Sequence, residues 1–125
     1  MLNNIAHIQA ELESLGCKTT LRKTPQGEAV VFPYQVEVGP HKGQYFILGI
    51  SMQGEEPYPE YPPHWIHLTP PVDDGKGGSI AKYHDEKGHE WIAMSRPPGS
   101  MWDELPTKNM DVYLKEHLRR FWNNM

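Results

Sequence analysis

The feature that most limits the fold of this chain is the segment PYPEYPPHWIHL, residues 57–68. It places four prolines and three large aromatic side chains in twelve residues. Flexible linkers are poor in aromatic residues. The interior of a strand excludes prolines, because each removes a hydrogen-bond donor from the ladder. The segment therefore predicts a stiff, packed surface loop that ends where a strand begins, near Trp65.

Length and charge narrow the class of protein. A chain of 125 residues can bury one core, so we expect a single domain over residues 1–125. The net charge of −4 provides no basic field for nucleic acid or an anionic membrane, so we expect neither as a partner.

The cell compartment follows from cysteine usage and hydropathy. Cys17 is the single cysteine, which excludes an internal disulfide and is typical of the reducing cytosol. No apolar run reaches membrane-spanning length, and the N-terminus lacks the basic-then-apolar pattern of a signal peptide. We expect a cytoplasmic protein.

The two ends of the chain have helical periodicity. Near the N-terminus Asn3 or Asn4 can cap a helix that stops at Gly16. Near the C-terminus Asn109 can cap a second helix. The apolar positions predicted to face the core are Leu2, Ile5, Ile8, Leu12 and Leu15 in the first helix, and Met110, Leu114, Leu118, Phe121 and Met125 in the last.

Between the helices the period changes to two. We expect four strands, at residues 18–23, around Val36 and Val38, at 45–52 and at 65–69, joined as an antiparallel meander. In the third strand Phe46, Leu48 and Ile50 share one face. Residues 70–88 are rich in glycine and mixed charges, which predicts a long irregular loop. The fold class is α+β.

This order of elements, with the motif Tyr58-Pro59-Glu60-Tyr61-Pro62-Pro63, resembles the ubiquitin-conjugating enzyme (UBC) family. The resemblance covers nearly the whole chain. Other matching positions are Gly39-Pro40 and Gly43 before Tyr45-Phe46, the tripeptide region at Tyr83-His84-Asp85, Gly88, and Trp102 with Pro106 after it. Some compact bacterial members look similar in a Trp-x-x-x-Ser-Arg stretch such as residues 91–96.

The resemblance implies a carrier cysteine that holds a ubiquitin-like modifier as a thioester, received from an activating protein. Ala93 stands at the position of that cysteine, and Cys17 lies in the wrong part of the fold. The family's His-Pro-Asn tripeptide, whose Asn assists the oxyanion, reads His84-Asp85-Glu86. Ser95 is nearby, but the sequence shows no obvious base for it. We therefore expect no thioester.

Three interpretations remain open. Ala93 is an engineered replacement of cysteine, or the chain is a natural variant without the cysteine that acts as a modifier- or partner-binding adaptor. Alternatively, the proline motif is a coincidence in an unrelated α+β domain. The altered tripeptide slightly favours the natural variant.

The resemblance also implies partner-binding surfaces on the first helix, the proline loop and the tryptophan region. The corresponding residues are His7, Glu11, Tyr61, Pro62, Met101 and Trp102. Trp102 is either an exposed anchor for a partner or a core residue, and the proline loop either contacts partners or serves only in packing.

The histidines do not indicate a metal site. In a strand, the side chains of His64 and His67 would point to opposite faces, and His84 and His89 lack a completing cysteine or carboxylate pattern. Ser95 lacks the flanking glycines of a hydrolase nucleophile elbow. We expect no metal and no cofactor.

Overall fold

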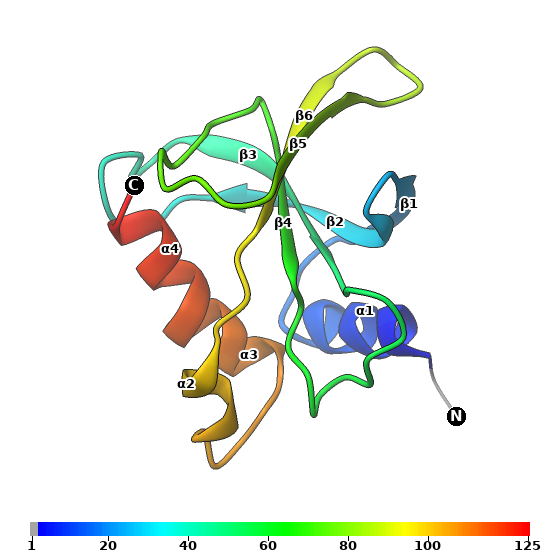
Figure 1. Ribbon diagram of the computed structural model, residues 1–125, viewed down its shortest axis with the longest axis vertical. Coiled ribbons are helices and arrows are strands. Elements are labelled where there is room, and N and C mark those ends of the chain that lie inside the picture. The colour runs from blue at the N-terminus through cyan, green and yellow to red at the C-terminus, as the bar shows by residue number, and fades with distance from the viewer. Residues whose placement is uncertain (1–2) are drawn as a thin grey trace.

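The computed structural model describes residues 3–125. Within this range the fold consists of an N-terminal helix, a sheet and a helical C-terminal region (Figure 1). The helix α1 spans Asn4–Ser14. The strands are β1 (Thr20–Thr24), β2 (Gly27–Gln35), β3 (Tyr45–Ser51), β4 (Trp65–Thr69), β5 (Ile80–His84) and β6 (Glu90–Ser95). The C-terminal elements are α2 (Ser100–Asp103), α3 (Met110–Val112), the π-helical segment η1 (Tyr113–Leu118) and α4 (Arg119–Asn123).

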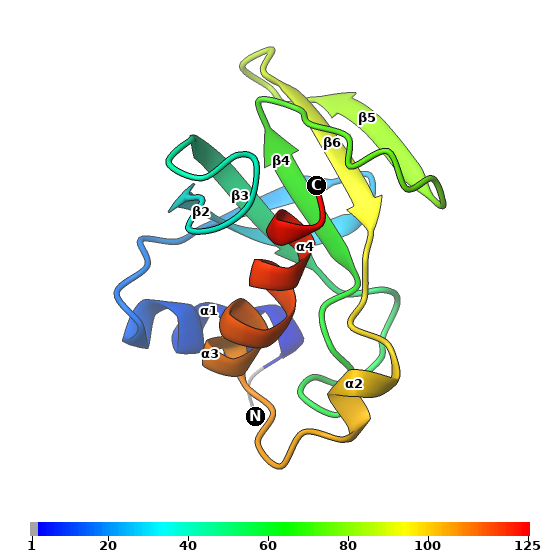
Figure 2. The same ribbon diagram turned by 90° about the vertical axis from the view of Figure 1, so that its left-hand side faces the viewer.

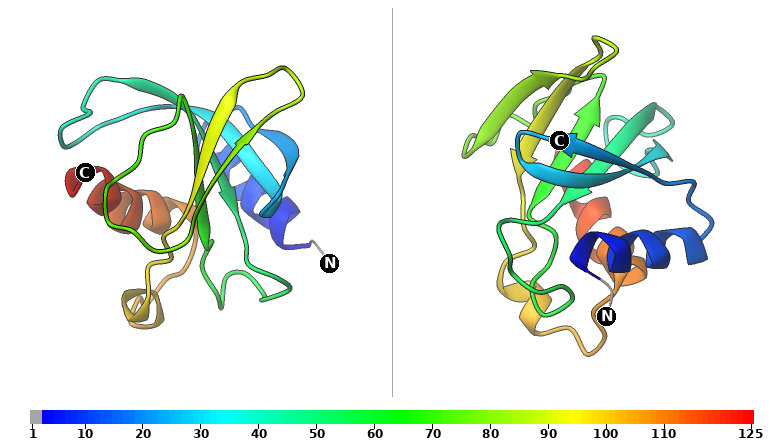
Figure 3. Two further views of the ribbon diagram at one scale, coloured as in Figure 1. Left: turned by 45° about the horizontal axis from the view of Figure 1, so that its top comes forward. Right: turned by 90° about the vertical axis from the view of Figure 1, so that its right-hand side faces the viewer.

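The strands form one antiparallel sheet in the order β1-β2-β3-β4-β6-β5. The sheet is strongly curled, as the two views of Figure 3 show. The C-terminal helical run lies across one face of the sheet, and α1 lies below its end (Figure 2), in contact with α3 and β2. The α+β class is confirmed.

The expected number of strands is wrong, because the hairpin of β5 and β6 raises it from four to six in the described range. The hairpin departs from a simple meander, since β6 and not β5 pairs with β4. β5 lies within residues 70–88, where we expected an irregular loop. Its five residues, IAKYH, are too short to show a period among the surrounding glycines. Pairing with the buried strand β6 stabilises β5. No pattern in the sequence shows that these two segments pair.

The second strand was also misplaced. β2 covers Gly27–Gln35 and ends before Val36, whose N–H donates to the Gln44 carbonyl at 2.9 Å in the turn towards β3. Ala29 to Phe32 are four consecutive buried residues, so this strand lacks the alternation of buried and exposed positions that marks a strand in the sequence. β1 begins at Thr20 and β3 ends at Ser51, each one or two residues from the prediction, and β4 matches it.

The helix ends follow their capping residues. The Asn3 side chain accepts a hydrogen bond from the Ala6 N–H at 2.7 Å, and Gly16 has φ +91°, which suits the stop after α1. Ile8 and Leu12 are buried as predicted, but Leu15 is 43 % exposed because the helix ends at Ser14. Leu2 lies outside the described residues.

The C-terminal helix also starts as predicted, since the Asn109 side chain accepts from the Val112 N–H at 2.9 Å. Met110, Leu118 and Phe121 are buried against the sheet, and Leu114 and Met125 are partly buried beside them. Phe46, Leu48 and Ile50 of β3 face the same core, which confirms their inward orientation.

The proline loop is bound to both helices through Glu11. The Tyr58 hydroxyl donates to Glu11 Oε1 at 2.6 Å, and the Met110 N–H donates to the same oxygen at 2.9 Å. The Asn4 amide donates to the Glu56 carbonyl at 2.7 Å and accepts from the Tyr58 N–H at 3.0 Å. Glu11 therefore joins α1, the proline loop and the start of α3, and the loop has the packing role that we considered.

We expect Glu11→Ala to lower the free energy of unfolding by about 1–3 kcal/mol, because it leaves two partly buried donors without their acceptor. Chemical denaturation measures this change. Glu116→Ala, which removes an exposed carboxylate from the last helix, is the control and should change stability by less than about 0.5 kcal/mol. Equal effects of the two substitutions would contradict the role of Glu11.

Candidate functional site

Ala93, at the expected carrier position, lies in the middle of β6. It is paired with His67 of β4 on one side and with Ala81 of β5 on the other, and it is fully buried. Its side chain points to the face opposite that of Ile92 and Met94, which belong to the main core. A thiol at this position would not be open to the C-terminus of a modifier.

The tripeptide His84-Asp85-Glu86 lies at the β5–β6 turn. The hairpin register places His84 opposite Glu90 and three residues from Ala81, so it is about 10 Å along the strands from the Ala93 position. The structure does not bring the expected carrier position and the tripeptide together.

Asp85 and Glu86 stabilise the hairpin. Asp85 accepts hydrogen bonds from the Trp91 indole N–H at 3.0 Å and from the backbone N–H of Lys87 and of His89. The bond from Trp91 in particular holds the pKa of the Asp85 carboxyl well below its usual range. Glu86 accepts from Arg22 of β1 at 2.8 Å, which ties the first strand to this hairpin across the curl of the sheet.

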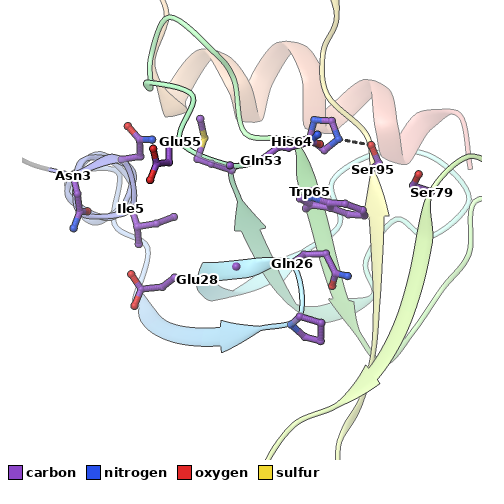
Figure 4. A pocket seen from close by; sticks show the side chains of 15 residues that line it. Asn3, Ile5, Gln26, Glu28, Gln53, Glu55, His64, Trp65, Ser79 and Ser95 are labelled. Atoms are coloured by element: carbon purple, nitrogen blue, oxygen red, sulfur yellow. Dashed lines mark hydrogen bonds between the residues drawn. The ribbon is translucent and has the colours of Figure 1, made fainter.

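An open cleft of about 880 Å³ lies at the other end of the sheet (Figure 4). Its walls come from the start of α1, the β1–β2 turn, the residues after β3 and the ends of β4 and β6. The lining residues are Asn3, Asn4, Ile5, Pro25, Gln26, Gly27, Glu28, Met52, Gln53, Gly54, Glu55, His64, Trp65, Ser79 and Ser95.

Ser95 faces a histidine in this cleft, a neighbour that the sequence did not show. His64 Nε2 lies 2.6 Å from Ser95 Oγ. Burial lowers the pKa of the His64 imidazole, so the ring is neutral at pH 7. The two residues are 31 positions apart and meet because β4 pairs with β6, with Trp65 opposite Ser95. Only the order of the strands could have predicted this pair.

A second polar cluster lies deeper on the same face of the sheet. His67 is fully buried, with Nε2 at 2.8 Å from Ser51 Oγ and Nδ1 at 2.7 Å from the Tyr83 hydroxyl. Burial lowers the pKa of His67 to about 4. Gly49 leaves room for the imidazole, because a Cβ there would lie 3.1 Å from His67 Cβ. We did not predict any role for this cluster.

The candidate partner-binding residues divide into exposed and internal ones. Tyr61 is 47 % exposed, and Pro62, His7 and Met101 are half-buried. Trp102 is 1 % exposed, and its indole N–H donates to the Pro59 carbonyl at 2.8 Å. Trp102 is therefore a core residue and not an exposed anchor for a partner. Glu11 mainly makes the internal contacts described above.

The remaining candidates are less suited to chemistry. Cys17 is half-buried after α1, and burial raises the pKa of its thiol, which disfavours the reactive thiolate. Among residues 3–125 no group of three or more His, Cys, Asp or Glu side chains could hold a metal ion. None of the helices in the described range has the length and apolar character needed to cross a membrane.

Comparisons with protein-family models, with curated proteins and with solved structures find no significant match to this chain.

We expect Trp102→Ala to lower the free energy of unfolding by about 3–5 kcal/mol, because it opens a large cavity in the main core. Tyr61→Ala truncates an exposed aromatic side chain and is the matched control, with an expected change below about 0.5 kcal/mol. Thermal or denaturant melts of both variants measure the difference. A Trp102→Ala variant as stable as the Tyr61→Ala variant would show that Trp102 is not a core residue.

We expect stability to fall as the pH is lowered from about 6.5 to about 4. His67 has a folded-state pKa of about 4 and an unfolded pKa near 6.5, so the unfolded chain binds more protons in this window. The contribution of His67 is about 3 kcal/mol at most. The substitution His67→Gln should flatten this dependence in denaturation curves taken between pH 7 and pH 4.

Burial also lowers the pKa values of His64 and His117, so the variant should retain part of the slope. An unchanged slope in His67→Gln would contradict a buried neutral His67.

Proposed function

We propose that this chain is a relative of the ubiquitin-conjugating enzymes that lacks their thioester chemistry and acts in a bacterial, cytoplasmic pathway. In this role it binds and presents a ubiquitin-like modifier or its activating protein, and it does not carry the modifier as a thioester. The burial of Ala93 is the observation that supports the absence of a carrier thioester. The order of the elements and the YPEYPP motif support the relation to the family.

The interpretation of Ala93 as an engineered replacement is less well supported. An intact carrier site requires a reachable thiol beside an oxyanion donor. Here the position is closed by strands on both sides, and the side chains of Asp85 and Glu86 are engaged with Trp91 and Arg22. These surroundings do not depend on the side chain at position 93, so a natural cysteine there would be equally enclosed.

The exposed part of the proline loop is the surface that we propose for partner binding. Tyr61 and Pro62 border a groove of about 210 Å³ that also contains Glu56, Glu60, His64, Pro97, Gly99 and Asp103. The groove has three carboxylates and, among its described lining residues, no lysine or arginine. An aromatic residue with an acidic rim fits a basic partner surface that presents an apolar centre.

The thioester test compares the chain with its Ala93→Cys variant. Each is incubated with nucleotide and with the activating protein and ubiquitin-like modifier of the same bacterium, and adducts are resolved on non-reducing gels. We expect no thiol-sensitive adduct with either chain. An adduct gained by Ala93→Cys would show a disabled enzyme, and an adduct of the unchanged chain that is lost in Cys17→Ser would place the carrier at Cys17.

The binding test is a titration of the chain with the same modifier and activating protein. We expect Tyr61→Ala to weaken binding about 30-fold, which corresponds to about 2 kcal/mol. Tyr45→Ala is the matched control, because Tyr45 is 72 % exposed at the start of β3. Absence of binding to both proteins, or equal losses in the two variants, would contradict the proposal.

A further inference from the structure

We propose that Ser95 and His64 form a nucleophile–base pair that accepts an acyl group from esters whose acyl part carries a positive charge. The site is the open cleft between the start of α1 and the end of the sheet (Figure 4). This activity goes beyond the binding function proposed above and does not rest on it.

The position of the pair is fixed by the backbone. The His64 N–H donates to the Ser51 carbonyl, the Ser95 N–H to the Ser79 carbonyl and the Arg96 N–H to the His64 carbonyl, each at 2.9 Å. Three backbone bonds thus join these segments without help from the side chains. These backbone bonds bring Ser95 Oγ and His64 Nε2 to a distance of 2.6 Å. The two segments therefore do not depend on this side-chain contact to stay together.

The other serine–histidine contact makes a useful comparison. Ser51 and His67 are fully buried, and both ring nitrogens of His67 are engaged, by Ser51 and Tyr83. No substrate can reach that serine. Ser95 and His64 are only partly buried and both line the cleft, so the hydroxyl can meet an ester.

The ionisation state of His64 suits a general base. Burial lowers its pKa, and the negative charge of Glu56 acts in the opposite direction. Glu28 and Glu55 are the other charged groups lining the cleft in the described range. A neutral imidazole can accept the Ser95 proton, and the efficiency of a general base is greatest when its pKa is near the working pH.

The charge of the cleft defines the substrate class. Its described lining includes the carboxylates of Glu28 and Glu55 but neither lysine nor arginine. Trp65 adds an aromatic surface beside Ser95 (Figure 4). Carboxylates and an aromatic face both favour a cation. A volume of about 880 Å³ is sufficient for a small aromatic ester.

The hydrogen-bond donors indicate how far the reaction proceeds. The backbone N–H groups of Ser95 and Arg96 are already engaged, so they cannot form an oxyanion hole. The side-chain donors that line the cleft and remain for this role include the Ser79 hydroxyl, the Trp65 indole and the amides of Gln26 and Gln53. Without a preorganised backbone pair, we expect the acyl-serine to form but to hydrolyse slowly.

Acylation of Ser95 replaces the ester bond of the substrate with an ester bond to the serine. The Ser95 oxygen forms a bond to the acyl carbon, and the bond from that carbon to the leaving phenolate oxygen breaks. The Ser95 proton passes to His64 Nε2, which releases it to solvent as the phenolate departs. Water later cleaves the acyl-serine and restores the hydroxyl, with the acyl group leaving as a carboxylic acid.

The test uses p-nitrophenyl p-guanidinobenzoate and the neutral p-nitrophenyl benzoate, with rates normalised to hydroxide hydrolysis of each ester. We expect a burst close to one equivalent of p-nitrophenolate and a single acyl adduct at Ser95 by peptide mass spectrometry. The guanidino ester should react at least about 10-fold faster, as expected for about 1.4 kcal/mol of charge recognition. The rate should rise with pH to a plateau, with a midpoint below pH 6.5.

Three variants make the test specific. Ser95→Ala should abolish the adduct, and His64→Gln should slow acylation about 100-fold or more, as for loss of a general base. Ser100→Ala removes an exposed serine at the start of α2 and should leave the acylation rates of both esters unchanged. Circular dichroism confirms that each variant is folded. An unlabelled protein, an adduct that persists in Ser95→Ala, or equal rates for the two esters would overturn the proposal.

Discussion

The alternation of side chains across one curled sheet is the constraint on which the rest of the structure depends. Successive residues of each strand point to opposite faces. One face carries the apolar side chains of β2, β3, β4 and β6 and is covered by the C-terminal helical run. The other face carries small or polar residues at Gly49, Ser51, His67, Ala93 and Ser95. Beside them on this face lies a second, smaller apolar cluster of Ala29, Val31, Trp91 and Tyr83. The position that the UBC resemblance assigns to a carrier thiol falls on this second face.

The second face places two histidines in different environments. His67 is fully buried, and Ser51 and Tyr83 engage both of its ring nitrogens. His64 is partly buried and lines the open cleft, where it faces Ser95 at the end of β6. Burial lowers the pKa of both rings, but only the second is accessible to a ligand. The closed pair therefore belongs to the scaffold, whereas the open pair is available for chemistry.

Much of the scaffold could be predicted from local signals, and the site could not. Asn3, Gly16 and Asn109 mark helix ends through short-range geometry, and Phe46, Leu48 and Ile50 show their face by alternation. β5 is short and surrounded by glycines, so its strand character depends on pairing with β6. The contact between His64 and Ser95 likewise depends on the pairing of β4 with β6, a long-range feature without a local pattern. Trp102 could not be placed, because burial of a tryptophan depends on packing that distant segments provide.

The most direct test of this account is the protonation state and tautomer of the two histidines in the folded protein at pH 7. Long-range proton–nitrogen NMR correlations of the imidazole rings measure both. The account predicts that both rings are neutral and that His64 Nε2 carries no proton and accepts the Ser95 hydroxyl. A His64 imidazolium, or a proton on His64 Nε2 donated to Ser95, would contradict the assignment of His64 as the base.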